Sequence, residues 1–210
     1  MTVALGEIVS RSVNRLVSRA HLPRRLAETP GDRLLLHVSD TPYEIYGFLR
    51  VLIRRLQPAI IVHTGDLVDD MKLEYDVQKT QRYAKRAAEL IRVFEESPAA
   101  DIYITAGNHD DPDVLQSLLR RSLLLPAGLH PIANRKVWID HYGDVRSARA
   151  EWDLFGHERT PPSGPTDQGL RLNGLTHANV IDVSVSWVYH VEYPMDVDRY
   201  RRLERSTRGM

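Results

Sequence analysis

Residues 59–69 read Ala-Ile-Ile-Val-His-Thr-Gly-Asp-Leu-Val-Asp, and this stretch decides the fold that the sequence predicts. Its first part, Ala59–His63, is a short apolar run that is typical of a buried strand. Gly65 and Asp66 follow at once, so the aspartate is expected on a tight turn at the end of the strand. From such a turn one carboxylate can reach a divalent cation and bridge two. Taken alone, the pattern fits a purely structural turn equally well.

The same arrangement of strand and polar cluster occurs on both sides of this stretch. Leu34–Ser39 is an apolar run that ends at Asp40, and Ile102–Thr105 is another that ends at Gly107-Asn108-His109. Apolar residues at helical spacing separate the runs. Strands that alternate with helices predict a parallel sheet with right-handed crossovers, and ligands bind beyond the carboxyl ends of such strands. The three polar clusters are therefore expected to converge.

The remaining segments complete the prediction of a layered α/β fold, with central β-sheets flanked by helices, over residues 31–200. A helix is predicted from about Glu74 to Glu96, and Asp111-Pro112 has the composition of a helix start, because the Asp oxygen can accept a backbone N–H and proline lacks a donor. The second half contains short β-rich pieces at Arg135–Ile139, Trp152–Phe155 and Val180–Tyr193.

Two terminal segments lie outside this domain. Residues 1–30 are interpreted as an extra N-terminal amphipathic helix and a turn, because apolar residues recur at helical spacing among polar ones. This helix could pack on the core, or it could form a homo-oligomer or partner contact. Residues 201–210 are interpreted as a polar tail.

Composition excludes several functional classes. The 28 basic and 28 acidic side chains cancel, so no whole-chain field indicates a nucleic-acid or membrane partner. The chain has no cysteine, which excludes thiolate ligands and a cysteine nucleophile and leaves His, Asp, Glu and Asn for metal chemistry. No apolar run reaches the roughly 18 residues of a membrane helix, and the N-terminus lacks a signal-peptide pattern. A soluble cytoplasmic protein is the expectation.

The cluster after the third strand carries the strongest chemical signal. Asn108 can bind a metal through its carbonyl oxygen, and His109 can donate a proton to a leaving alkoxide. Asp110 can orient and charge that histidine. Phe155-Gly156-His157 likewise places a polar residue after a glycine at the end of a later strand.

Among the other histidines, His141 is a further ligand candidate because it follows the predicted strand that ends at Ile139. His130 and His177 compete with it for this role. His37 and His63 lie within strand runs, so each is expected to be packed and hydrogen-bonded.

The order of these pieces resembles the calcineurin-like metallophosphoesterase superfamily. That family carries Asp-x-His, Gly-Asp-x-x-Asp, Gly-Asn-His-Asp or Glu, an isolated His, and Gly-His-x-His, each at the end of a strand. This chain shows Ser39-Asp40-Thr41-Pro42, Gly65-Asp66-Leu67-Val68-Asp69, Gly107-Asn108-His109-Asp110, His141-Tyr142, and Gly156-His157-Glu158-Arg159. The middle blocks match fully and the first and last match in part. The resemblance covers about Leu34 to Tyr193.

The resemblance implies a two-metal site for phosphate esters. Asp66 would bridge the ions, Asp40 would bind the first ion, and the second site would be completed by Asn108, His141 and His157. His109 would stand beside the phosphate as the leaving-group acid.

Two departures from the family pattern fall on the first metal. Its two histidines are replaced by Pro42 and Arg159. We therefore expect one firmly bound divalent ion, with Mn, Fe, Zn and Ni as the candidates, and a second ion weak or absent. Arg159 is expected where the first ion would be, paired with Asp40 or holding a phosphate oxygen.

Hydrolysis of a phosphate mono- or diester is the function that these residues favour. The alternative is a scaffold or binding domain that has kept the fold and lost the reaction, as a retromer scaffold subunit of this family has. Pro42 and Arg159 favour the alternative, whereas retention of a costly polar cluster favours the enzyme. A nuclease is a third interpretation, but the balanced charge shows no basic excess for nucleic acid.

Overall fold

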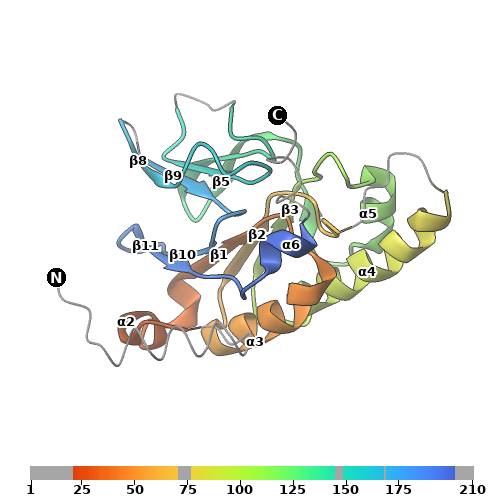
Figure 1. Ribbon diagram of the computed structural model, residues 1–210. Helices are drawn as coiled ribbons and strands as arrows, with labels where there is room; N and C mark the ends of the chain where they lie inside the picture. The colour runs from red at the N-terminus through yellow and green to blue at the C-terminus, as the bar shows by residue number, and fades with distance from the viewer. Residues whose placement is uncertain (1–20, 71–76, 145–148, 168, 202–210) are drawn as a thin grey trace.

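The computed structural model describes residues 21–70, 77–144, 149–167 and 169–201 (Figure 1). The helix expected in the first twenty residues lies outside these ranges. The described chain begins with two short helices, α2 (Arg24–Ala27) and the 3₁₀ helix η1 (Gly31–Arg33), which lead into the first strand. Within the described ranges, no helix has the length and apolar character required to cross a membrane.

The first sheet contains the predicted parallel strands. Its strand order is β11-β10-β1-β2-β3-β4, and β1 to β4 run parallel: β1 (Leu34–Val38), β2 (Ile60–His63), β3 (Asp101–Ile104) and β4 (Leu123–Leu124). The connections contain η2 (Tyr43–Ile45), α3 (Tyr46–Leu56), α4 (Val77–Glu95) and α5 (Pro112–Leu118). The antiparallel pair β10 (Ala178–Asp182) and β11 (Trp187–Val191) extends the sheet beside β1. The predicted strand, helix, strand arrangement is confirmed.

The second sheet has the order β5-β6-β7-β9-β8. Its strands are β5 (Gly128–Ile132), β6 (Arg135–Ile139), β7 (Trp152–Phe155), β8 (Gly164–Thr166) and β9 (Gly169–Asn173). Strands β6 and β7 match the predicted strands residue for residue, whereas the predicted piece Val180–Tyr193 lies across the β10–β11 hairpin. Strands β4, β5, β8 and β9 were not predicted. Two of them, β5 and β8, contain both glycine and proline and lack an apolar run.

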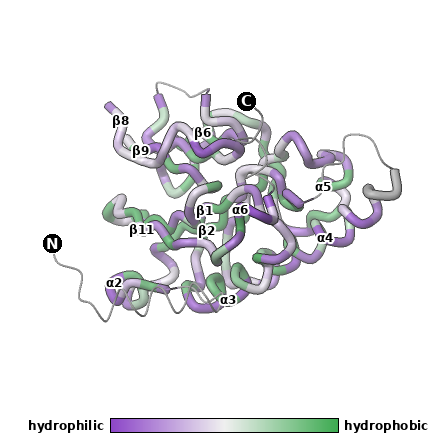
Figure 2. Tube along the Cα trace, in the orientation of Figure 1, coloured by the Kyte–Doolittle hydropathy of each residue, from purple (hydrophilic) through white to green (hydrophobic). Residues whose placement is uncertain are grey.

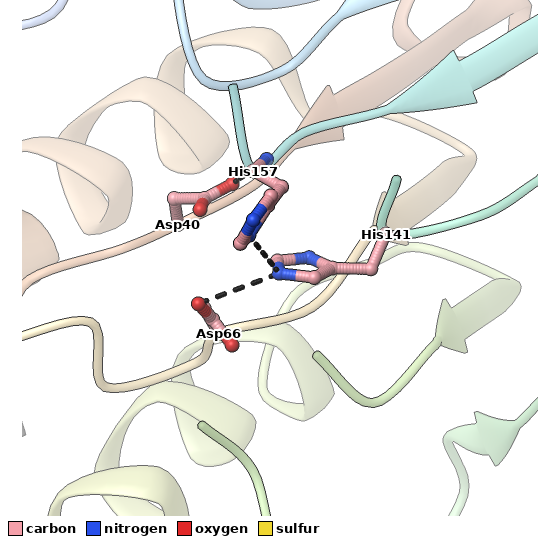
Figure 3. A group of neighbouring side chains, drawn as sticks. All are labelled: Asp40, Asp66, His141 and His157. Carbon is pink, nitrogen blue, oxygen red and sulfur yellow. Dashed lines mark hydrogen bonds and ion pairs between the residues drawn. The ribbon is translucent and has the colours of Figure 1, made fainter. Parts of the chain in front are cut away.

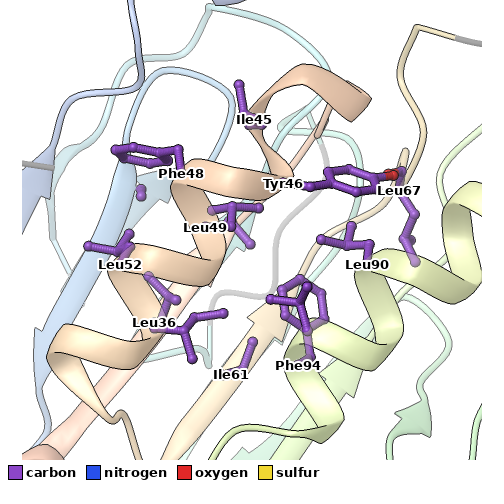
Figure 4. Packing of buried hydrophobic residues seen from close by; sticks show 14 of the residues in the cluster. Leu36, Ile45, Tyr46, Phe48, Leu49, Leu52, Ile61, Leu67, Leu90 and Phe94 are labelled. Atoms are coloured by element: carbon purple, nitrogen blue, oxygen red, sulfur yellow. The ribbon is translucent and has the colours of Figure 1, made fainter. Parts of the chain in front are cut away.

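Two apolar layers lie on opposite faces of the first sheet. Leu34, Leu36 and Val38 of β1 pack with α3 and α4 in one core, and Figure 4 shows part of that packing. The intervening Leu35 packs toward the second sheet, against residues of β6, β7 and β9. This alternation follows from the two-residue period of a strand. Helices α3 and α4 carry both hydrophobic and hydrophilic residues along their length (Figure 2), as expected for helices that cover a sheet and face solvent.

The predicted start of α5 is confirmed. Asp111 Oδ1 accepts the backbone N–H groups of Asp113 at 3.0 Å and Val114 at 3.1 Å, and Pro112 occupies the first helical position. At the other end of the described chain, the short helix α6 (Val197–Tyr200) is followed by Arg201. The sequence assigned Arg201 to a polar tail, but this side chain is fully buried; residues 202–210 lie outside the described ranges.

Candidate metal centre

The candidate ligands come from five loops that follow five strands of the two sheets. Asp40 follows β1, Asp66 follows β2 and Asn108 follows β3, while His141 and His157 follow β6 and β7. Parallel strands present their carboxyl ends at one edge of a sheet, which is why residues so distant in sequence meet. Figure 3 shows four of these side chains directed toward one another. Asp40, Asp66, His141 and His157 each offer a ligand atom within 4.8 Å of the others.

The Nε2 atom of His141 is the centre of this cluster. It lies 3.0 Å from Asn108 Oδ1, 3.1 Å from His157 Nδ1 and 3.4 Å from Asp66 Oδ2. Atoms bound about 2.1 Å from one ion are roughly 3.0 Å apart at octahedral angles and roughly 3.4 Å apart at tetrahedral angles. The three separations therefore match the spacing of neighbouring ligands around one divalent ion.

The second ring nitrogen of His141 is held by the protein backbone. Nδ1 lies 2.8 Å from the carbonyl oxygen of Thr64, to which it can donate its hydrogen. A neutral imidazole that donates from Nδ1 leaves Nε2 free to bind a metal, and a backbone carbonyl is a common partner of metal-binding histidines. Burial alone would lower the pKa of His141, but the hydrogen bond to Asp66 and the charges of Asp40 and Asp66 raise it to about 9. A positive charge, from a proton or a metal ion, is therefore stabilised at this atom.

The two aspartates are fixed by backbone donors. Asp66 Oδ1 accepts the N–H of His109 at 3.0 Å, and Asp40 Oδ2 accepts the N–H of His157 at 3.0 Å. Burial acts to raise the pKa of Asp66, yet the hydrogen bond and charge of His141 hold it below its usual value. Burial raises the pKa of Asp40 despite the opposing charge of His141. Asp66 is consequently the carboxylate whose charged form is better stabilised.

Unusual backbone conformations support this convergence. Asp40, Asp66 and His157 have φ values of 51°, 56° and 65°, in the left-handed region that residues other than glycine rarely adopt. Such conformations tend to occur where the surrounding structure and function require them. The loops also approach too closely for ordinary residues: a Cβ on Gly107 would overlap the Asp66 side chain, and one on Gly156 would overlap Asp40.

The proton-donor region differs from the prediction. Asp110 was expected to orient His109, but its carboxylate instead accepts hydrogen bonds from the N–H groups of Asp66 (2.7 Å), Leu67 (3.0 Å) and Gly107 (2.9 Å), and from the Tyr83 hydroxyl (2.8 Å). These four donors occupy its acceptor positions. Asp110 therefore joins the loops after β2 and β3.

Asp69, a residue for which no role was predicted, also lies beside His109. Asp69, Asp66 and His109 offer ligand atoms within 4.8 Å of one another. Asp69 is buried, and burial together with the charges of Asp40 and Asp66 raises its pKa to about 8. Its place in the Gly-Asp-x-x-Asp block was the available sequence signal.

Arg159 does not take the predicted position beside Asp40. Its guanidinium is largely exposed and pairs with Asp198 at 2.6 Å. The buried arginine near Asp40 is Arg201, which donates to the carbonyl oxygens of Asp40 (2.7 Å), Leu175 (2.6 Å) and Ser39 (3.3 Å). No local motif marks Arg201, since its partners lie up to 162 residues away.

The other histidines take the roles expected of structural residues or lie outside the cluster. His37 and His63 are fully buried and contact the hydroxyls of Thr64 and Thr41 at 3.0 and 3.1 Å. His130 contacts the carbonyl of Pro126 and His177 lies against His190, so neither replaces His141.

Comparison with known proteins decides the family. The family model described as calcineurin-like phosphoesterase matches residues 34–200. The chain belongs to this family. An archaeal phosphodiesterase superposes with a TM-score of 0.55 at 17% identity, covering 76% of this chain and 99% of the other. The Escherichia coli phosphoesterase YfcE gives a TM-score of 0.50 at 14% identity, covering 76% and 98%. At these identities the likeness shows the fold, and no curated protein sequence matches this chain.

This member of the calcineurin-like phosphoesterase family retains the candidate ligands on one side of the cluster more completely than those on the other. Asp66, Asn108, His141 and His157 form the set centred on Nε2 of His141. On the side of Asp40, the two missing histidines are not replaced by Arg159, whose charge is directed to Asp198. The donor set of two imidazoles, one amide oxygen and one carboxylate suits a borderline divalent transition metal.

Proposed function

We propose that this phosphoesterase hydrolyses a phosphate mono- or diester with one firmly bound divalent ion, held by Asp66, Asn108, His141 and His157. The observation that carries the proposal is the set of three ligand-like distances around His141 Nε2, from 3.0 to 3.4 Å. A divalent ion bound there supplies polarisation of the phosphoryl oxygen and a lower pKa for water. Mn, Fe, Zn and Ni are the candidate ions.

His109 is proposed as the proton donor to the leaving oxygen. Its backbone N–H is fixed by Asp66 and its ring nitrogens lie 3.2 and 3.4 Å from Asn108 Nδ2, so the ring stays beside the cluster. Asp66 and Asp69 offer oxygens within 4.8 Å of a ring nitrogen of His109, so both carboxyl groups lie beside the proposed donor. Asp110 serves the same reaction indirectly, because it fixes the loops that carry Asp66 and His109.

Substitutions can separate metal binding from proton donation. Asn108→Ala should weaken metal binding, because it removes an oxygen at a ligand distance from His141. His109→Ala should lower turnover on the order of 10²- to 10⁴-fold while metal content is unchanged. His130→Ala, at a half-buried position of the edge strand β5, is the matched control and should change neither property.

The experiment measures metal content by elemental analysis and hydrolysis of 4-nitrophenyl phosphate and bis(4-nitrophenyl) phosphate with each divalent ion. About one ion per chain together with hydrolysis supports the proposal. Two firmly held ions would refute the single-ion count and leave the hydrolysis intact. A purified protein that binds no divalent ion and hydrolyses neither ester would instead support the scaffold function, which the displaced Arg159 favours.

A further inference from the structure

An exposed tyrosine lies directly beside the candidate ligands. The Tyr142 ring is 4.6 Å from the ring of His157 and 5.1 Å from the ring of His141, edge-on in both cases. Its side of the cluster remains open, since Tyr142 is 41% exposed. A large aromatic side chain that contacts one buried and one half-buried imidazole and also faces solvent gains little from its own burial. The exposed part of this ring is therefore available to a molecule bound at the cluster.

The loop that carries Tyr142 is fixed on both sides. The Tyr142 N–H donates to Asp140 Oδ1 at 3.1 Å, and the His141 carbonyl accepts the N–H of Gly156 at 3.1 Å. The guanidinium of Arg171 donates to the carbonyl of Gly143. A ring held by such a loop is preorganised. A ligand that packs against it therefore binds without a large entropic cost for ordering the loop.

Two aspartates flank Tyr142 on its own loop. Asp140 Oδ1 accepts the N–H of Tyr142 at 3.1 Å, and Asp144 follows two residues later. Negative charges this close to the Tyr142 ring disfavour an anionic group on the organic part of the ligand. An uncharged aromatic group of the ligand would instead meet only the aromatic surface of Tyr142. The position thus favours an organic group that is aromatic and carries no charge of its own.

We propose that Tyr142 is a specificity-determining residue: it forms the wall that receives the organic group of the ester, and it selects uncharged aryl esters over alkyl esters. This inference rests on the proposed function, because it assumes that the phosphoryl group binds at the His141 cluster. Aromatic pairs in offset or edge-to-face contact stabilise a complex beyond the area that they bury. Alkyl groups cannot make this contact.

Two phosphonates that cannot be hydrolysed as esters test the inference by binding alone. Calorimetry with manganese-loaded protein should show that phenylphosphonate binds about tenfold more tightly than methylphosphonate, or about 1.4 kcal/mol. Tyr142→Phe should keep this preference. Tyr142→Ala should reduce it to about twofold or less by weakening phenylphosphonate and leaving methylphosphonate unchanged. Tyr200→Ala, at a tyrosine of similar exposure on α6, is the matched control and should keep the preference.

The outcomes separate this inference from the proposed function. If wild-type protein binds both phosphonates equally, or if Tyr142→Ala weakens both equally, the selection by Tyr142 is refuted while phosphate binding stands. If wild-type protein binds neither phosphonate, both proposals are refuted. Should the alanine variant fail to fold, Tyr142→Leu, which keeps apolar bulk without an aromatic ring, gives the same comparison.

Discussion

Two uncharged histidines that are buried in the first sheet are expected to contribute a loss of stability as the pH falls. Burial lowers the pKa of His37 from 6.5 to about 3. Burial, followed by the charge of His37, lowers the pKa of His63 to about 3 as well. A base whose pKa falls on folding binds fewer protons in the native state than in the unfolded state. Its contribution to stability is therefore complete above about pH 6.5 and is lost as the pH falls toward about 3.

The size of the effect follows from these values. Each pH unit below the unfolded pKa costs about 1.36 kcal/mol for each histidine. Between pH 8 and pH 5 each buried imidazole therefore costs about 2 kcal/mol, and His37 and His63 together cost about 4 kcal/mol. A typical domain has a stability of only about 5–15 kcal/mol, so a contribution of this size is measurable when variants are compared.

The contribution of His37 can be isolated by urea unfolding of the wild type and of His37→Gln at pH 8, 7, 6 and 5. The variant should lose about 2 kcal/mol less than the wild type between pH 8 and pH 5. Buried acids with raised pKa values, such as Asp110, change stability with the opposite sign, but they are present in both proteins and cancel in the difference. Thr64→Val removes the hydroxyl that contacts His37 and keeps the imidazole, so it should lower stability without reducing the loss below pH 6.5. Equal losses in wild type and His37→Gln would refute a neutral buried His37.

Two further substitutions test the packing around the site. Gly156→Ala should weaken metal binding about tenfold or more, measured by competition with a chelator, because its Cβ would overlap Ser39 and Asp40. Gly164→Ala, where a Cβ would meet nothing within 4 Å, is its control, and equal affinity in both variants would contradict the steric argument. Arg201→Lys should lower the free energy of unfolding by about 3 kcal/mol, because lysine cannot serve three carbonyl oxygens in this planar arrangement. A change below about 0.5 kcal/mol in urea unfolding would show that these contacts are not stabilising.

The part of the site that could be predicted from sequence is the part governed by strand order. Asp40, Asp66 and Asn108 each follow a strand of the parallel sheet, and parallel strands must bring their carboxyl ends together. His141 and His157 follow parallel strands of the second sheet in the same way. Strand and polar cluster are both local patterns, so one sequence suffices to recognise them.

The contacts that the sequence missed depend on residues that are distant in the chain. Asp110 follows His109 directly, which suggested a pair, but its carboxylate meets the backbone of Asp66 across 44 positions. Arg201 reaches the carbonyl of Asp40 across 161 positions. In both contacts the partner is a backbone group, the N–H of Asp66 or the carbonyl of Asp40. Every residue carries such groups, so the sequence contains no signature of these contacts.

Strands β5 and β8 escaped prediction for a related reason. Both are edge strands of the second sheet, and their antiparallel pairing to β6 and β9 stabilises segments that contain proline. Proline is tolerated at the edge of a sheet, where a missing N–H costs no central hydrogen bond. A pattern based on continuous apolar runs therefore does not mark these two edge strands.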